Sequence, residues 1–130
     1  MRPILLAATA AGIIGLGVSP ALSQDTGPAK VGQTATGPAF TNANGMTLYT
    51  FNRDMTGYSN CNAQCALDWP PLLAGADAKA AGDWSIVTRD DGKRQWAYKG
   101  KAVYAFTKDA KPGDAGGEGA DSGKWHVAKP

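Results

Sequence analysis

A seven-residue phrase occurs twice in this chain of 130 residues: LYTFNRD at 48–54 and VYAFTKD at 103–109. Equivalent positions of the phrase are 55 residues apart, whereas the tryptophans Trp69 and Trp125 are 56 apart, so a single insertion separates two otherwise matching copies. A short unit with an aromatic face cannot bury that face alone, and two such units can share one interior. We therefore expect a core built from the repeated and neighbouring aromatic residues Tyr49, Phe51, Trp69, Trp84, Trp96, Tyr104, Phe106 and Trp125.

The segments around the repeated phrase have the composition of β-strands. Asn44-Gly45 stands between two short alternating segments, which predicts a hairpin with a type I′ turn. The stretches WSIVTR, RQWAY and KAVYAF predict a three-stranded meander over 84–106, and WHVA at 125–128 predicts a closing strand. NCNAQCALDWPPLL predicts a short helix that ends before Pro70, and the Gly-rich stretch 110–123 predicts a long loop.

Together these patterns predict a mainly β fold with one short helix near the cysteines. Two pseudo-symmetric repeats, at about 39–83 and 84–128, would form a single domain over 39–130. A small antiparallel barrel or a sandwich would satisfy the pattern, and the sequence leaves both open.

The N-terminal segment MRPILLAATAAGIIGLGVSPALSQ has a basic residue, an apolar run and then small residues, as secretory signal peptides do. We expect a signal peptide over 1–23, cleaved after Ser23 or, alternatively, after Ala21, and a periplasmic or secreted protein with no membrane span after cleavage. Residues 24–38, rich in Gly, Pro and Thr, predict a flexible linker.

The paired Tyr-x-Phe-x-x-Asp phrases, with CALDWPPL, DDGKRQWAYKGKAVYAF and WHVA, resemble a family of predicted bacterial secreted-repeat lipoproteins that carry a Yx(F/W/Y)xxD motif. The resemblance covers about residues 39–128. It implies a repeated, exported fold and leaves the biochemical role open, since the family's function is unestablished. This chain has no cysteine before Cys61 to accept a lipid, so we do not expect a lipid anchor.

Cys61 and Cys65 are the only two cysteines of the chain. An even number of cysteines in an exported protein favours a disulfide. Their spacing is also compatible with a redox-active pair, although it is not C-x-x-C, and with thiolate ligation of a metal.

Other residues suggest chemistry more weakly. His126, the single histidine, is expected on a strand surface; with Met46, Met55 or the thiols it would form a soft-metal site for copper or haem iron. Asp54 and Asp109 are expected to accept backbone N–H groups in turns after the aromatic strands. The alternative is Ca²⁺ ligation, with help from the oxygen-bearing side chains of Asn52, Asp114 and Glu118.

The charge pattern and the scarcity of catalytic residues limit the classes of function. Thirteen basic and eleven acidic residues are mixed along the chain, which excludes the clustered basic face of a nucleic-acid-binding protein. No nucleophile elbow or catalytic triad pattern is present. We expect a monomeric, non-enzymatic envelope module without a cofactor that binds an envelope protein or a small ligand. The alternatives are a periplasmic copper or haem handling protein and a thiol–disulfide redox protein.

Overall fold

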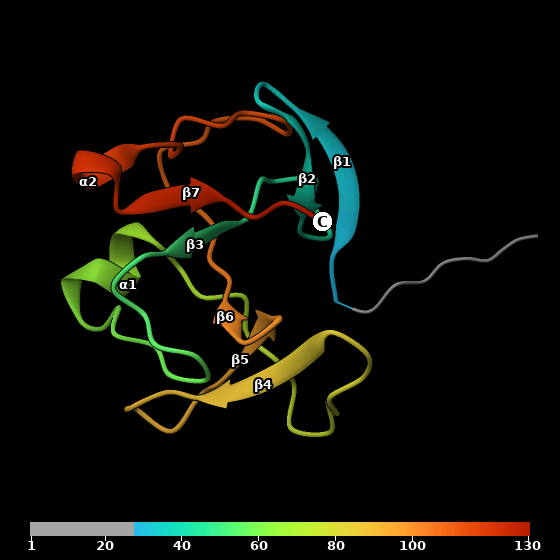
Figure 1. Cartoon of the computed structure of the whole chain (residues 1–130), viewed down its shortest axis with the longest axis vertical. Helices are drawn as coiled ribbons and strands as arrows, with labels where there is room; N and C mark the ends of the chain where they lie inside the picture. Colours follow the sequence, from blue (N-terminus) through green and yellow to red (C-terminus); the bar gives the residue numbers. More distant parts are fainter. Residues whose placement is uncertain (1–27) are drawn as a thin grey trace, which may run out of the picture.

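The computed structural model describes residues 28–130; the predicted signal peptide and the first residues of the predicted linker lie outside this range. Within these described residues, seven short strands and two short helices follow one another (Figure 1): β1 (Lys30–Thr34), β2 (Gly37–Thr41), β3 (Tyr49–Phe51), α1 (Gln64–Asp68), β4 (Trp84–Thr88), β5 (Arg94–Tyr98), β6 (Lys101–Ala102), α2 (Ala120–Gly123) and β7 (Trp125–Val127). The strands form three small antiparallel sheets, ordered β1-β2, β3-β7 and β4-β5-β6. The fold is therefore mainly β, as predicted, with a short helix beside the cysteines. The sheets do not close into a barrel.

The prediction of a flexible linker over 24–38 is wrong for the residues from Lys30 onward. β1 pairs with β2 in a complete antiparallel register from Lys30–Thr41 to Thr34–Gly37. Side-chain pattern does not reveal this strand, because β1 exposes most of its side chains, including Val31 at 53%. Its backbone is ordered by the ladder to β2, whose residues Ala39 and Phe40 are buried.

The predicted turn around Asn44-Gly45 exists, but its type differs from the prediction. Gly45 has a positive φ of 82°, while Asn44 does not, so the turn is not type I′. The Asn42 side chain accepts the backbone N–H groups of Asn44 and Met46 at 2.9 and 3.0 Å, which closes a longer loop. An antiparallel bridge between Thr41 and Thr47 follows this loop.

The predicted meander and closing strand are both present. β4, β5 and β6 form the three-stranded sheet, and β7 pairs with β3.

 The register places Phe51 opposite Trp125, with 73 residues of chain between them. In Figure 1 these two strands lie side by side although their colours come from distant parts of the sequence.

The two repeats exchange their last strands. β7, which ends the second repeat, pairs with β3 of the first repeat. In the same way the end of the first repeat pairs with the second, through bridges from Pro71 to Tyr104 and from Leu73 to Gln95. The backbone bonds match in both halves: Asn52 N–H donates to the Lys124 carbonyl at 2.7 Å, and Thr107 N–H donates to the Asp68 carbonyl at 3.1 Å.

A pseudo-twofold axis passes between Tyr49 and Tyr104. Their backbones form a reciprocal bridge, with N–H···O distances of 2.7 and 2.9 Å. The β3-β7 sheet and the bridge between the two tyrosines therefore join the repeats through backbone hydrogen bonds, while β1-β2 and β4-β5-β6 each belong to one repeat.

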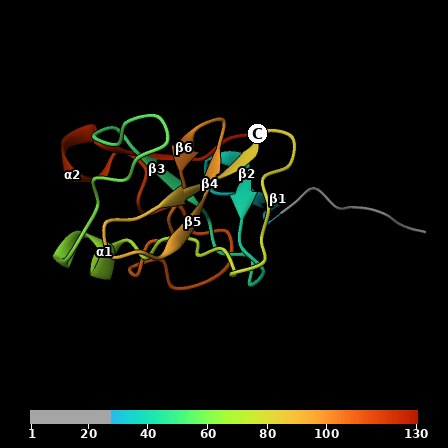
Figure 2. The ribbon, with the colours of Figure 1, turned by 90° about the horizontal axis from the view of Figure 1, so that it is seen from below.

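Two buried clusters fill the interior on either side of the strands. The larger contains residues of both repeats: Ala39, Tyr49, Cys61, Trp69, Ala102, Tyr104, Trp125 and Val127. The smaller contains Ala29, Phe40, Leu48, Trp84, Val103 and Ala128. Viewed from two directions, α1 and α2 lie at the same end of the molecule, away from β1 and β2 (Figures 1 and 2).

Candidate functional site

The repeated tyrosine and aspartate side chains bind each other across the two repeats. The Tyr49 hydroxyl donates to Asp109 at 2.6 Å, and the Tyr104 hydroxyl donates to Asp54 at 2.7 Å. Each aspartate also closes its own loop: Asp54 accepts the Asn60 N–H at 2.7 Å, and Asp109 accepts the Gly116 N–H at 2.9 Å. Each copy of the repeated phrase thus supplies a hydroxyl donor and a carboxylate acceptor to the other copy.

Burial raises the pKa of both tyrosines well above the usual value for the residue. The hydrogen bond to Asp109 adds to the effect at Tyr49, and the bond to Asp54 adds to it at Tyr104. Burial also raises the pKa of Asp54, against the opposing effects of the Asn60 N–H, the Tyr104 hydroxyl and the Arg89 charge. Both tyrosines are therefore neutral hydrogen-bond donors at ordinary pH.

Four aromatic rings form one continuous stack through the centre of the larger cluster. The ring centroids are 4.3 Å apart from Phe51 to Trp125, 3.8 Å from Trp125 to Trp69, and 4.0 Å from Trp69 to Phe106. The order alternates between the repeats, because each phenylalanine stacks on the tryptophan of the other copy. Trp69 and Trp125 at the middle of the stack are buried in the core, and Phe51 and Phe106 at its two ends are partly buried.

A buried polar network surrounds Tyr104 and has no counterpart around Tyr49. Arg89, which is 4% exposed, donates to Ser59 Oγ at 3.0 Å and to Gln95 Oε1 at 2.8 Å. Since Tyr104 donates its only hydroxyl hydrogen to Asp54, the 2.5 Å contact between Ser59 and Tyr104 has Ser59 as its donor. A chain of hydrogen bonds thus connects the guanidinium to the Asp54 carboxylate, which offsets part of the cost of burying the charge.

Sequence patterns alone do not predict this network. An arginine that follows an apolar strand and precedes a turn, as Arg89 does, is usually exposed. The one available signal is Gln95, a polar residue on the inward side of β5, where an unpartnered amide would be costly.

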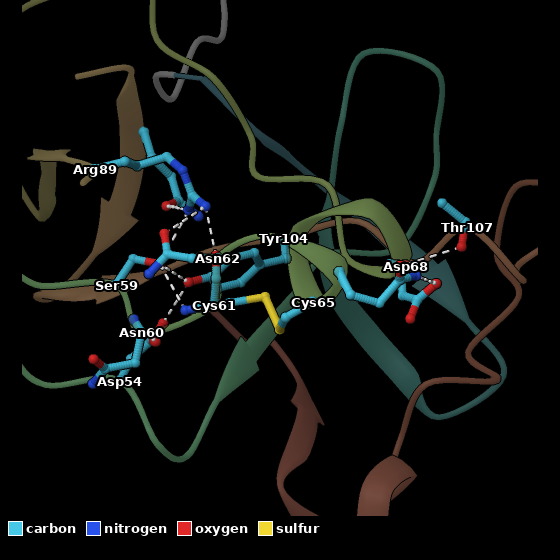
Figure 3. The surroundings of a disulfide bond; sticks show 12 residues. Asp54, Ser59, Asn60, Cys61, Asn62, Cys65, Asp68, Arg89, Tyr104 and Thr107 are labelled. Carbon is cyan, nitrogen blue, oxygen red and sulfur yellow. Dashed lines mark hydrogen bonds between the residues drawn. A yellow bond between two sulfur atoms is a disulfide. The ribbon is translucent and has the colours of Figure 1, made fainter. Parts of the chain in front are cut away.

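The disulfide between Cys61 and Cys65 is confirmed, with an S–S distance of 2.05 Å (Figure 3). The two sulfurs differ in environment, because Cys61 is completely buried and Cys65 is partly exposed at the start of α1. Arg89 Nη2 donates to the Cys61 carbonyl at 2.5 Å and to Asn62 Oδ1 at 3.4 Å, so the guanidinium lies directly against this loop.

Partly exposed Cys65 lines a cavity of about 390 Å³ at the end of the molecule that carries the two helices. The floor is aromatic, formed by Trp69, Phe106 and Trp125, and charged side chains of both signs stand at its rim: Asp68, Lys108 and Asp121.

His126 lies on β7 with its side chain on the face opposite Trp125 and Val127. It contacts Glu118, with 2.8 Å between His126 Nδ1 and Glu118 Oε2, and Glu118 Oε1 accepts the Val127 N–H at 2.8 Å. These contacts, the backbone N–H first, hold the pKa of Glu118 below its usual range. Met55 is 65% exposed in another loop, and Met46 belongs to the turn after β2.

His126 and Glu118 line a groove with a volume of about 550 Å³. Three lysines line it as well, Lys99, Lys101 and Lys129, and none of them forms an ion pair within residues 28–130. The remaining lining residues are Thr36, Thr50, Asn52, Tyr98, Val127, Ala128 and Pro130. Four segments that are distant in sequence form the groove, so no sequence motif predicts it.

Within residues 28–130 no group of three or more His, Cys, Asp or Glu side chains is arranged to hold a metal ion. Over the same residues, no helix is long and apolar enough to cross a membrane.

Comparison with known proteins places the chain in a family. No curated protein and no solved structure matches it. A family described as a secreted repeat of unknown function matches it twice, over residues 30–73 and 85–129. These two ranges coincide with the units that exchange strands in the structure, and together they cover more than half of the chain. The chain therefore belongs to this family of secreted repeats of unknown function.

Proposed function

We propose that this protein is an exported, non-catalytic binding module whose ligand is a small organic anion. The observation that carries the proposal is the groove of about 550 Å³ lined by Lys99, Lys101 and Lys129. Its volume falls within the roughly 300–1,000 Å³ typical of small-molecule sites.

The charges of the groove support an anionic ligand. The groove is lined by three ammonium groups that form no ion pair within residues 28–130 and by the side-chain carboxylate of Glu118, which already accepts two bonds from β7. Lysines in such a position favour a ligand with two or more negative groups. Tyr98 adds an aromatic surface at the rim, where the Lys99 ammonium lies 5.4 Å from its ring centroid.

The location of the groove on the scaffold also supports binding. Thr50 and His126 are a cross-strand pair of β3 and β7, so they are held by the strand exchange at the centre of the fold. Their rigid placement lowers the entropy that a ligand would have to remove on binding. Cleavage near Ser23 and a periplasmic or secreted location belong to the same proposal, supported by the secreted family.

Titration of the exported protein with citrate and with inorganic phosphate, followed by backbone amide chemical shifts, tests the proposal. We expect saturable shifts confined to the turn around Lys99, to Lys101 and to the end of β7. A double variant, Lys101→Gln with Lys129→Gln, should bind about tenfold more weakly, because each exposed ion pair contributes up to about 1 kcal/mol.

The matched control is Lys30→Gln with Lys93→Gln, which removes two exposed lysines outside the groove. It should bind like the unmodified protein. Equal weakening in both double variants, or an absence of saturable binding for every anion tested, would overturn the proposal.

A further inference from the structure

Only the first repeat contains the disulfide. Matching hydrogen bonds identify the equivalent positions in the second repeat. The N–H groups of Asn60 and Gly116 donate to the repeated aspartates, and the carbonyls of Asp68 and Lys124 accept from the repeated strands. Counting from these matched bonds, Cys61 corresponds to Gly117 and Cys65 corresponds to Asp121.

The second repeat closes the same connection without a disulfide. Gly117 donates its N–H to the Tyr49 hydroxyl at 3.2 Å, and a Cβ there would lie 2.8 Å from atoms of the Trp69 and Tyr49 rings. Seven residues lie between Gly117 and Trp125, the first residue of β7. Hydrogen bonds and close packing alone hold this connection. The repeat fold does not require a covalent link at this place, and a link across four residues confers little stability.

The two cysteines of the disulfide lie in different environments. Cys65 lines the aromatic-floored cavity of about 390 Å³, whereas Cys61 is fully buried and its backbone carbonyl accepts a hydrogen bond from the Arg89 guanidinium. A thiolate entering the cavity can reach only the Cys65 side of the bond. The guanidinium charge held at the Cys61 carbonyl favours Cys61 as the leaving thiolate, against the opposing effect of its burial.

We infer that the Cys61–Cys65 disulfide is a thiol-exchange site at which low-molecular-weight aminothiols attack Cys65. In the first step the thiolate of the aminothiol bonds to Cys65 Sγ, the Cys61–Cys65 bond breaks, and Cys61 leaves as a thiolate. In the second step another aminothiol thiolate attacks the mixed disulfide, releasing the low-molecular-weight disulfide and the Cys65 thiolate. Two thiols are oxidised and one protein disulfide is reduced, so the electrons balance.

The charges at the rim select this class of thiol. The rim suits a molecule that carries both an ammonium, which would lie near Asp68 and Asp121, and a carboxylate, which would lie near Lys108. The rings of Trp69 and Phe106 offer an apolar floor for its carbon chain. Free cysteine is the simplest probe with this chemistry.

The test uses the folded, oxidised protein. It is incubated with cysteine, quenched with N-ethylmaleimide, and mapped by peptide mass spectrometry. We expect cysteine attached to Cys65 and maleimide attached to Cys61. Attachment to Cys61, an even distribution over both sulfurs, or modification only in denaturant would overturn the inference.

Three variants check the role assigned to Arg89. Arg89→Gln should slow the reaction with cysteine several-fold, Arg89→Lys should slow it less, and Arg94→Gln, which alters an arginine bound to carbonyls of another loop, should leave it unchanged. Near-ultraviolet circular dichroism establishes that each variant is folded; equal rates for folded Arg89→Gln and the unmodified protein would contradict the role.

This inference stands apart from the proposed anion groove, because the two sites share no lining residue. The Lys101→Gln, Lys129→Gln variant should exchange thiols at the normal rate, so either proposal can fail alone.

Discussion

At the scale of single residues, the two tyrosines show how one repeated position acquires two environments. Both donate to an aspartate of the other repeat, but Tyr104 also accepts from Ser59 and so joins the network that ends at Arg89. Tyr49 instead accepts only the backbone N–H of Gly117. The framework is symmetric, and the polar network is not.

Removing the two hydroxyls should therefore have unequal costs. Tyr104→Phe leaves Asp54 and Ser59 with unpartnered groups and interrupts the chain to Arg89, so we expect a loss of about 2–4 kcal/mol in the free energy of unfolding. Tyr49→Phe should cost about 1–2 kcal/mol. Urea denaturation of both variants measures the difference, and a larger cost for Tyr49→Phe would contradict this assignment.

The raised tyrosine pKa values predict a loss of stability in alkali. The stabilising effect of keeping these hydroxyls neutral is complete below the pKa of an unfolded tyrosine, about 10, and is lost as the pH rises toward the folded-state values. Each tyrosine should contribute a slope of about −1.4 kcal/mol per pH unit above that point.

Denaturation between pH 9 and pH 11 tests this prediction by comparison. Tyr104→Phe should lose stability less steeply than the unmodified protein, by about the slope of one group, because lysine titration is common to both proteins. Parallel pH profiles would show that Tyr104 ionises freely in the folded state.

At the scale of elements, the sequence pattern predicts strands well where alternating side chains are buried on one face. The meander of β4, β5 and β6 and the closing strand β7 follow from such patterns, and α1 ends where Pro70 requires it. The sequence pattern does not predict β1, because most of its side chains are exposed. Its order comes from backbone pairing with β2, which composition does not reveal.

The exchange of strands could not be predicted from the repeat. Two equal copies give the same alternation whether each last strand pairs within its own repeat or with the other, so the spacing of Tyr49 and Tyr104 fits both arrangements. The lysine groove is hidden for a related reason, since Lys99, Lys129 and Thr36 meet only after β7 docks on β3.

The disulfide should matter little for stability at this scale. The double variant Cys61→Ala, Cys65→Ala should lose about 2 kcal/mol or less, because the closed loop is very short. It should keep its circular dichroism spectrum and a single cooperative transition. Unfolding of the double variant at room temperature would show that the disulfide is required for the fold.

At the scale of the whole molecule, the two halves form one body with a shared interior. The larger buried cluster takes residues from both repeats, and the ring stack alternates between them. Each half supplies the other's last strand, aspartate and tryptophan. The central claim is therefore that the repeated phrases are completed across the two copies and not within one.

Double-mutant cycles measure this claim most directly. The cycle of Tyr49→Phe with Asp109→Asn joins the two repeats, and the cycle of Tyr49→Phe with Asp54→Asn stays within one. We predict a coupling energy of about 1–3 kcal/mol in the first cycle and less than about 0.5 kcal/mol in the second. Strong coupling of Tyr49 to Asp54, with none to Asp109, would contradict the exchanged architecture.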